Sequence, residues 1–341
     1  MIDLRSDTVT KPDKPMLKAM MSAETGDDVY GEDPTINKLQ EEIAELTGKE
    51  DALFVPSGSM GNQICVACHT EKGDEVILES QAHIFYYETG APALISSVQL
   101  NLIPSDDGMP PIGQIEDAIR PDTYYLPRTS LICLENTHNR HSGSIISQDY
   151  IKEVRKIADK HGLKMHLDGA RLWNASAATG MSIRELSEPF DSVSLCFSKG
   201  LGAPVGSIIC GSKKFIKKAL EMRKILGGGM RQAGILAAGA GYALKHNLAK
   251  LEADHINAGV FAERISACNG ISINMKKIQT NIVLFDLTNG MASDELAVLC
   301  RQKGLAIIPF GPRTLRAVFH HQVTAGDAEK AADIICAVLE R

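Results

Sequence analysis

The chain has 341 residues, of which 44% are hydrophobic and 23% charged, proportions that suit a globular protein with a sizeable core. Its net charge of −6 argues against nucleic acids and anionic membranes as partners. We find no apolar run long enough to span a bilayer and no secretion signal at the start, so we expect the protein in the cytosol.

Helical and strand-like segments alternate over the first 210 residues. Asp33 and Pro34 predict the start of a helix, and Gly48 predicts its end. A second helix is expected over 150–160. The expected strands are short apolar runs at 52–55, 75–78, 131–134, 163–167, 193–197 and 205–210. This alternation predicts an α/β fold whose central sheet is mostly parallel and flanked by helices.

The pattern changes near residue 248, where a long helical stretch over 248–268 begins. It is followed by strands expected at 281–287, 306–309 and 315–319 and helices expected at 293–303 and 326–339. We therefore predict a smaller C-terminal α+β domain at 248–341, after an N-terminal arm at 1–14 and a large domain at 15–247.

The eight cysteines do not suggest a disulfide framework in a chain of this length and compartment. Five lie in apolar stretches and are expected to pack as small hydrophobic residues: Cys133, Cys196, Cys210, Cys300 and Cys336. The segment CVACH at Cys65–His69 has the haem-attachment spacing C-x-x-C-H, but it continues an apolar helical face. We interpret it as core packing. The histidine pairs His138/His141 and His320/His321 lack a companion pattern, so no metal site is predicted.

Lys199 ends an apolar run in SLCFSKGLGAPVGS, and a glycine-rich stretch follows it. Such a lysine either extends to the surface or is a desolvated amine able to form a Schiff base with a carbonyl. The glycines favour the second interpretation, because they let the backbone approach a ligand closely.

Two other motifs complete a set with Lys199. Asp168 in HLDGAR ends another predicted strand, and a carboxylate there could hold a pyridine nitrogen protonated, although it could also be a turn aspartate. The segment PSGSMGN at 56–62 could expose backbone N–H groups to a phosphate or form an ordinary turn. It is neither a Walker loop nor G-x-G-x-x-G. Together the three motifs predict pyridoxal 5′-phosphate as cofactor.

With these motifs in place, the chain resembles the threonine aldolases, lyases with the fold type I (aspartate-aminotransferase) architecture of pyridoxal-phosphate enzymes. The resemblance covers nearly the whole chain and rests on MIDLRSDTVT, GDDVYGEDPT, PSGSMGNQ, GDEVILESQAHI, RTSLICLENTHN, HLDGARLWNA, SKGLGAPVGS and LGGGMRQAG. It implies aldol cleavage of L-threonine or L-allo-threonine to glycine and an aldehyde. The alternatives are a β-aryl-serine aldolase, an amino-acid racemase, a β-eliminating lyase and a non-catalytic cofactor-binding protein.

The resemblance also implies roles for single residues around the cofactor. Lys199 is expected to bind it covalently, Asp168 to pair with its ring nitrogen, and His83 to stack on the ring and assist proton transfer. The expected phosphate ligands are Gly58, Ser59 and Met60. His83 could instead be an ordinary core histidine.

On the substrate side, the resemblance assigns Arg171 to the cofactor and the substrate carboxylate, with Ser6 and Arg316 sharing the second task. Arg171 could instead be a structural ion-pair partner. Arg231 and Tyr30 are expected to reach a neighbouring subunit's site, Arg231 at its phosphate, which implies a homo-oligomer, commonly a tetramer. Tyr125 occupies a position where many family members have a histidine near the substrate hydroxyl. A phenol is a poor base at neutral pH, so this departure leaves the base and the diastereomer preference open.

Overall fold

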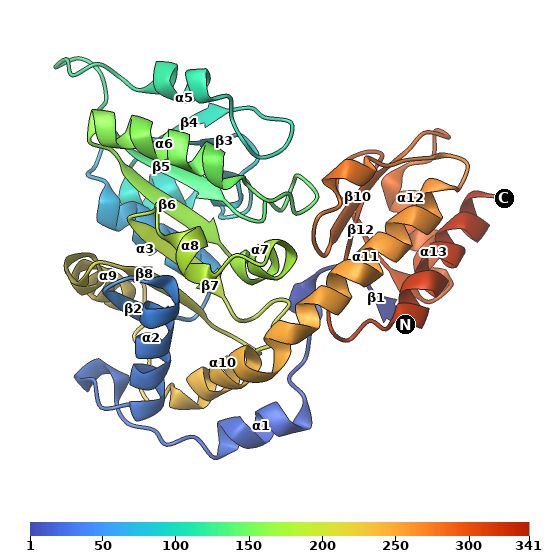
Figure 1. The fold of residues 1–341 in the computed structure, drawn as a ribbon, viewed down its shortest axis with the longest axis horizontal. Coiled ribbons are helices and arrows are strands. Elements are labelled where there is room, and N and C mark those ends of the chain that lie inside the picture. Colours follow the sequence, from blue (N-terminus) through green and yellow to red (C-terminus); the bar gives the residue numbers. More distant parts are fainter. Residues whose placement is uncertain (341) are drawn as a thin grey trace.

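The computed structural model describes residues 1–340 and contains a large lobe built on a seven-stranded sheet, together with a small lobe built on a four-stranded sheet (Figure 1). The strand order of the large sheet is β2-β8-β7-β6-β5-β3-β4. Its strands are β2 (Asp51–Val55), β3 (Glu75–Glu79), β4 (Gln99–Ile103), β5 (Thr129–Glu135), β6 (Lys164–Gly169), β7 (Ser192–Cys196) and β8 (Ser207–Gly211). Only β8 runs antiparallel to its neighbours, so the predicted mostly parallel sheet is confirmed.

Helices cover both faces of this sheet, as crossover connections between parallel strands require (Figure 1). In the large lobe they are α1 (Lys14–Met21), α2 (Pro34–Thr47), α3 (Gly58–His69), α4 (His83–Tyr86), α5 (Ile112–Ala118), α6 (Gln148–His161), α7 (Leu172–Thr179), α8 (Ile183–Ser187), α9 (Lys213–Ile225) and α10 (Gly234–Asn247). Helix α2 begins and ends as its sequence predicts. The Asp33 carboxylate accepts hydrogen bonds from the N–H groups of Thr35 and Ile36, both at 3.1 Å, and Gly48 closes the helix at a φ of 68°.

The small lobe has the sheet order β12-β13-β10-β9 and packs on helices of the C-terminal part of the chain. Its elements are α11 (Leu251–Ser266), β9 (Ile271–Ser272), β10 (Ile282–Leu287), α12 (Ser293–Gln302), β11 (Leu305–Ala306), β12 (Ile308–Pro309), β13 (Thr314–Val318) and α13 (Ala325–Leu339). The single strand expected at 306–309 is therefore two short strands. Helix α11 continues the line of α10 and carries the chain from one lobe to the other (Figure 1).

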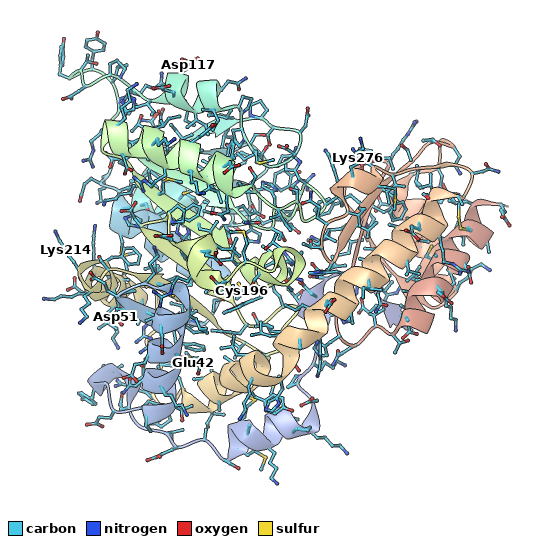
Figure 2. All side chains as sticks on the ribbon, in the orientation of Figure 1. Glu42, Asp51, Asp117, Cys196, Lys214 and Lys276 are labelled. Atoms are coloured by element: carbon cyan, nitrogen blue, oxygen red, sulfur yellow. A yellow bond between two sulfur atoms is a disulfide. The ribbon has the colours of Figure 1, made fainter. Side chains whose placement is uncertain are left out.

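The N-terminal segment belongs to both lobes. Strand β1 (Ile2–Asp3) pairs in parallel with β11, and the buried Leu4 joins the hydrophobic core of the small lobe. The large lobe has a separate core around its sheet, and Cys196, labelled in Figure 2, lies buried inside that lobe. By contrast, Asp117 and Lys214 lie at its periphery (Figure 2).

One disulfide is present, although the sequence suggested no disulfide framework and predicted that Cys336 packs as a small hydrophobic residue. Cys268, just after α11, is bonded to Cys336 in α13, and their Cα atoms are 5.5 Å apart. Cys336 is therefore not simply a small hydrophobic residue, and the 68 residues between the partners hide the pair from a local reading of the sequence. Cys65 of the CVACH segment is buried in α3, as expected. Among residues 1–340, no helix combines the length and apolarity that a membrane crossing needs.

Candidate active site

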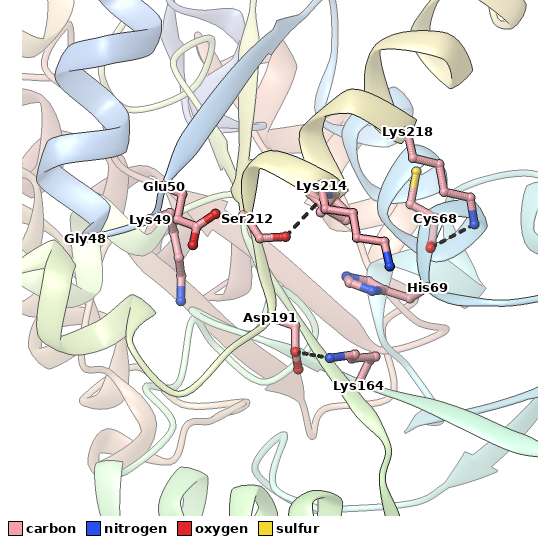
Figure 3. A pocket seen from close by; sticks show the side chains of 12 residues that line it. Gly48, Lys49, Glu50, Cys68, His69, Lys164, Asp191, Ser212, Lys214 and Lys218 are labelled. Atoms are coloured by element: carbon pink, nitrogen blue, oxygen red, sulfur yellow. Dashed lines mark hydrogen bonds and ion pairs between the residues drawn. The ribbon is translucent and has the colours of Figure 1, made fainter.

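A cleft of about 310 Å³ opens where the carboxyl ends of the parallel strands face the small lobe. Five predicted site residues line it together: Ser6, His83, Arg171, Lys199 and Arg316. A larger cavity of about 640 Å³ lies at the opposite end of the strands, where the parallel strands begin (Figure 3). It contains none of the predicted site residues, and three of its lysines are already bonded: Lys49 to the Phe190 carbonyl at 2.6 Å, Lys164 to Asp191 at 2.8 Å and Lys218 to the Cys68 carbonyl at 3.0 Å.

Lys199 follows β7 in a tight loop that turns the chain back into β8. The Gly202 N–H donates to the Lys199 carbonyl at 2.8 Å, and the Phe197 N–H donates to the Gly206 carbonyl at 3.0 Å. Gly202 and Gly206 have φ values of 78° and 110°, which side-chain-bearing residues rarely adopt. The glycines that followed Lys199 in the sequence thus shape the loop that presents its amine to the cleft.

Asp168 ends β6, the parallel neighbour of β7, so it lies at the same sheet edge as Lys199. Its carboxylate accepts a hydrogen bond from the Asn62 side chain at 2.8 Å and another from the Ala170 N–H at 3.1 Å. Burial alone would raise its pKa, but the positive charges of His83 and Lys199 outweigh burial and hold the pKa below the ordinary value. A buried carboxylate kept ionised in this way is suited to pairing with a protonated ring nitrogen.

His83 begins α4, and its side chain is hydrogen-bonded to Glu88, an acidic residue that the sequence did not predict in the site. Its Nδ1 donates to Glu88 at 2.8 Å, and Glu88 also accepts hydrogen bonds from Asn62 at 2.9 Å and Gln63 at 2.5 Å. Burial would lower the pKa of His83, but the hydrogen bond to Glu88, followed by the charge of Asp168, raises it above its ordinary value. Glu88 lies in an irregular segment after α4, where no periodicity marks it as important.

The predicted phosphate loop forms the first turn of α3. The Ser57 side chain accepts from the Met60 N–H at 3.2 Å, whereas the N–H groups of Gly58 and Ser59 find no acceptor within residues 1–340. A Cβ on Gly58 would lie 2.7 Å from the Cys196 sulfur, so the backbone is too close to β7 for a side chain. Two free N–H groups at a helix N-terminus suit an anion, while the Met60 N–H is already used.

Two arginines line the cleft, Arg316 from the small lobe and Arg171 from just after β6 in the large lobe. Arg316 in β13 stacks over the Phe310 ring at 4.7 Å and donates to the Asn139 side chain at 2.6 Å, while its Nε lacks a partner within the described chain. Burial, and then the charge of Arg171, lowers the pKa of Arg316 to about 10. Arg171 donates hydrogen bonds to Asp7 from Nε and from one terminal nitrogen, both at 2.7 Å, so only its other terminal nitrogen is available to a ligand in the cleft.

Three predicted site residues do not reach the cleft within one chain. Arg231 pairs with Asp27 at 3.0 Å, on the same surface region as Tyr30, which is 74% exposed. Tyr125 is 70% exposed and precedes β5, at the opposite end of that strand from the cleft.

Known proteins resemble this chain over most of its length. A family model described as beta-eliminating lyase matches residues 3–288. Low-specificity L-threonine aldolase 1 of Arabidopsis thaliana is 46% identical over 333 residues, covering 96% of this chain and 93% of that protein. The low specificity L-threonine aldolase of Escherichia coli K12 is 47% identical over 266 residues, covering 78% of this chain and 79% of that protein.

The chain belongs to the threonine aldolase family. The resemblance inferred from the motifs is confirmed, and the protein is a lyase. The fold agrees with that of a threonine aldolase from Leishmania major, which is 19% identical, with a TM-score of 0.84 over 99% of this chain and all (100%) of that one. A serine palmitoyltransferase from Sphingomonas wittichii shares the same architecture, with 18% identity and a TM-score of 0.77 over 98% and 86% of the two chains.

Proposed function

We propose that the cleft binds pyridoxal 5′-phosphate and cleaves L-threonine, L-allo-threonine and related β-hydroxy-α-amino acids to glycine and an aldehyde. The observation that carries this proposal is the shared placement of Lys199, His83 and Arg316 around one cleft with ionised Asp168 at the same sheet edge. Both relatives are named L-threonine aldolases, and these names support the same substrate class.

The residues present fit this cofactor. The free N–H groups of Gly58 and Ser59 would take the phosphate, the Lys199 amine would bind the aldehyde, and Asp168 would hold the ring nitrogen protonated. When bound, pyridoxal phosphate supplies an electron sink for the pair of electrons released from the Cα–Cβ bond.

The chain's other site residues orient the substrate and move its protons. Arg316, with its free Nε and its stacking on Phe310, would hold the substrate carboxylate, and the remaining nitrogen of Arg171 would assist. A carboxylate held in one orientation would decide which bond at Cα is placed to break. His83, with its pKa raised by Glu88, lies where it could carry the proton of the β-hydroxyl.

A purified holoenzyme given L-threonine tests this function through its products. We expect glycine and acetaldehyde in equal amounts, whereas a racemase, which inverts only Cα, would give D-allo-threonine and a β-eliminating lyase would give ammonia and a keto acid. A β-aryl-serine aldolase would prefer phenylserine, and a non-catalytic protein would give no product.

The role of Lys199 has its own test. Lys199→Ala should lose both turnover and the visible absorbance of the covalently bound cofactor. Lys214→Ala, in the remote cavity of Figure 3, is the matched control and should keep both. Normal cleavage of threonine by Lys199→Ala would refute the assignment.

Two further features remain part of this proposal. The exposed positions of Arg231 and Tyr30 support a homo-oligomer, with a tetramer as the expected form, in which these residues complete a neighbouring site. The separate cores of the two lobes support a division into an arm at 1–14, a large domain at 15–247 and a small domain at 248–341. A cytosolic location remains a prediction from the sequence.

A further inference from the structure

A cluster of buried histidine and glutamate side chains lies beside the cleft, formed by Glu79 at the end of β3 and by His138 and His141 in the loop after β5. Because β3 and β5 are parallel neighbours, their carboxyl ends bring these residues together. The loop itself turns tightly: the His141 N–H donates to the His138 carbonyl at 3.2 Å, and the two imidazole rings are 4.5 Å apart. The sequence spacing alone gave the histidines no third partner, and the fold supplies one.

The imidazole nitrogens of this cluster lie within ion-pair distance of the Glu79 carboxylate. His138 Nε2 is 3.1 Å from one Glu79 oxygen, and His141 Nε2 is 3.5 Å from the other. Neither nitrogen has a hydrogen-bond partner within residues 1–340, although His138 is fully buried and His141 is 7% exposed. Protonated imidazoles would pair with Glu79 at these separations, and a metal ion shared by all three side chains would satisfy the same atoms without that protonation.

The separations match those between ligands of one small metal ion. Zinc bonds of about 2.0–2.1 Å at a tetrahedral centre place neighbouring donor atoms roughly 3.3 Å apart, which lies between the two separations seen here. The carboxylate is oriented by the Gln81 N–H, which donates to it at 2.6 Å, as outer hydrogen bonds commonly fix metal ligands. Glu135 provides a further carboxylate oxygen 3.8 Å from His138 Nε2.

We propose that Glu79, His138 and His141 form a binding site for one zinc-class divalent ion. Two imidazoles and a carboxylate are borderline ligands that favour zinc and similar transition ions over magnesium. The ion would balance the buried negative charge of Glu79 and Glu135 and would bind both imidazole nitrogens. Access is available, because His141 also lines a surface cavity of about 360 Å³.

Such an ion would brace the substrate side of the cleft. The loop that carries both histidines also carries Asn139, whose side-chain oxygen accepts the hydrogen bond of Arg316, and whose N–H donates to Glu135 at 2.9 Å. The site is nevertheless distinct from the cofactor residues, so its occupancy can be measured without any assay of the reaction.

The test measures zinc bound to the holoenzyme after chelator treatment, dialysis and titration with zinc chloride. We expect one zinc ion per chain by elemental analysis, an upward shift in the unfolding temperature on addition of zinc, and no comparable binding of magnesium. Glu79→Gln and His141→Asn should each weaken zinc binding by at least about tenfold. His161→Asn, on α6 and outside the cluster, is the matched control and should bind zinc as the wild type does.

Either of two results would overturn the proposal. One is a wild-type chain that takes up no stoichiometric zinc, which would leave His138 and Glu79 as an ion pair only. The other is zinc binding that Glu79→Gln and His141→Asn leave unchanged. If both variants fail to fold, zinc should still protect His141 of the wild type from acylation by diethyl pyrocarbonate, and unchanged labelling would count against the site.

Discussion

Asp7 and Arg171 join the N-terminal arm to the large lobe through two parallel hydrogen bonds of 2.7 Å, one from Nε and one from a terminal nitrogen of the guanidinium. Both side chains are buried, and the Asn281 side chain donates a further hydrogen bond to Asp7 at 3.3 Å. Arg171 therefore combines the structural ion pair and the cleft position that its sequence context left as alternatives. Opposing burial, Arg171 holds the pKa of Asp7 well below its usual range.

Asp7→Asn should destabilise the protein and weaken substrate binding, because it leaves a buried arginine without its counter-charge. Breaking one side of a buried pair costs about 3–5 kcal/mol, measurable by urea denaturation. Asp3→Asn breaks the exposed pair with Arg5 on the same arm and should cost at most about 1 kcal/mol. Equal losses in the two variants would contradict this account.

The same pair makes stability fall in acid. Because folding depresses the pKa of Asp7, its stabilising contribution is present above the unfolded value of about 4 and is lost as the pH falls toward the folded value. Wild type should therefore lose stability below about pH 4 more steeply than Asp7→Asn does.

Glu88→Gln should shift the pH dependence of activity. Glu88 raises the pKa of His83, so removing its charge should move the kinetic limb that reports His83 to lower pH. The sign for stability is opposite to that of Asp7: the His83–Glu88 contribution is full below about pH 6.5 and is lost as the pH rises through the raised pKa. A pH–kcat/KM profile identical to that of wild type would show that Glu88 does not tune His83.

Gly58→Ala should impair cofactor retention, because the added methyl group would press against the Cys196 sulfur and displace the first turn of α3. The dissociation constant for pyridoxal phosphate, measured by absorbance after dialysis, should rise at least about tenfold, which corresponds to about 1.4 kcal/mol. Gly113→Ala is the control, since nothing lies within 4 Å of its added Cβ. Adding Cys196→Ala to Gly58→Ala should restore part of the affinity, and failure of this rescue would point to another cause.

Sharing of sites between subunits can be tested by complementation. Arg231→Ala and Lys199→Ala should each be inactive as pure oligomers, the first through weak cofactor binding and the second through loss of the amine. Mixed oligomers, formed by refolding the two variants together, should regain activity, because some sites would have both intact residues. A mixture as inactive as its parents would place Arg231 outside a shared site.

Tyr125 yields a prediction about stereochemistry. Within one chain it lies far along β5 from the cleft, so only a neighbouring subunit could bring it to a substrate. We expect Tyr125→His to change the ratio of L-threonine to L-allo-threonine cleavage, and Tyr124→His, next to it and fully exposed, to leave the ratio unchanged. The role proposed for Tyr125 would be discarded if its variant kept the wild-type ratio.

The parts predicted best from the sequence are those where a local pattern is strong. Lys199 and Asp168 end continuous apolar runs, and such runs become central parallel strands whose tips meet at one edge. Strand β4 was missed because Gln99 and Asn101 interrupt its apolar residues at the sheet edge. Asp7, Glu88 and Glu79 could not be recognised, because their partners lie far away in the sequence and only the fold brings them together.

The N-terminal arm has a practical consequence for handling the protein. Its first residues add a strand to the small lobe, and Asp7 pairs with Arg171 of the large lobe. The Thr10 hydroxyl donates a hydrogen bond to the Lys199 carbonyl at 3.1 Å. A bulky fusion ahead of Ile2 would therefore disturb all three of these contacts. Immobilisation linkers are therefore better coupled to the exposed lysines of α9, which lie on the far side from the cleft.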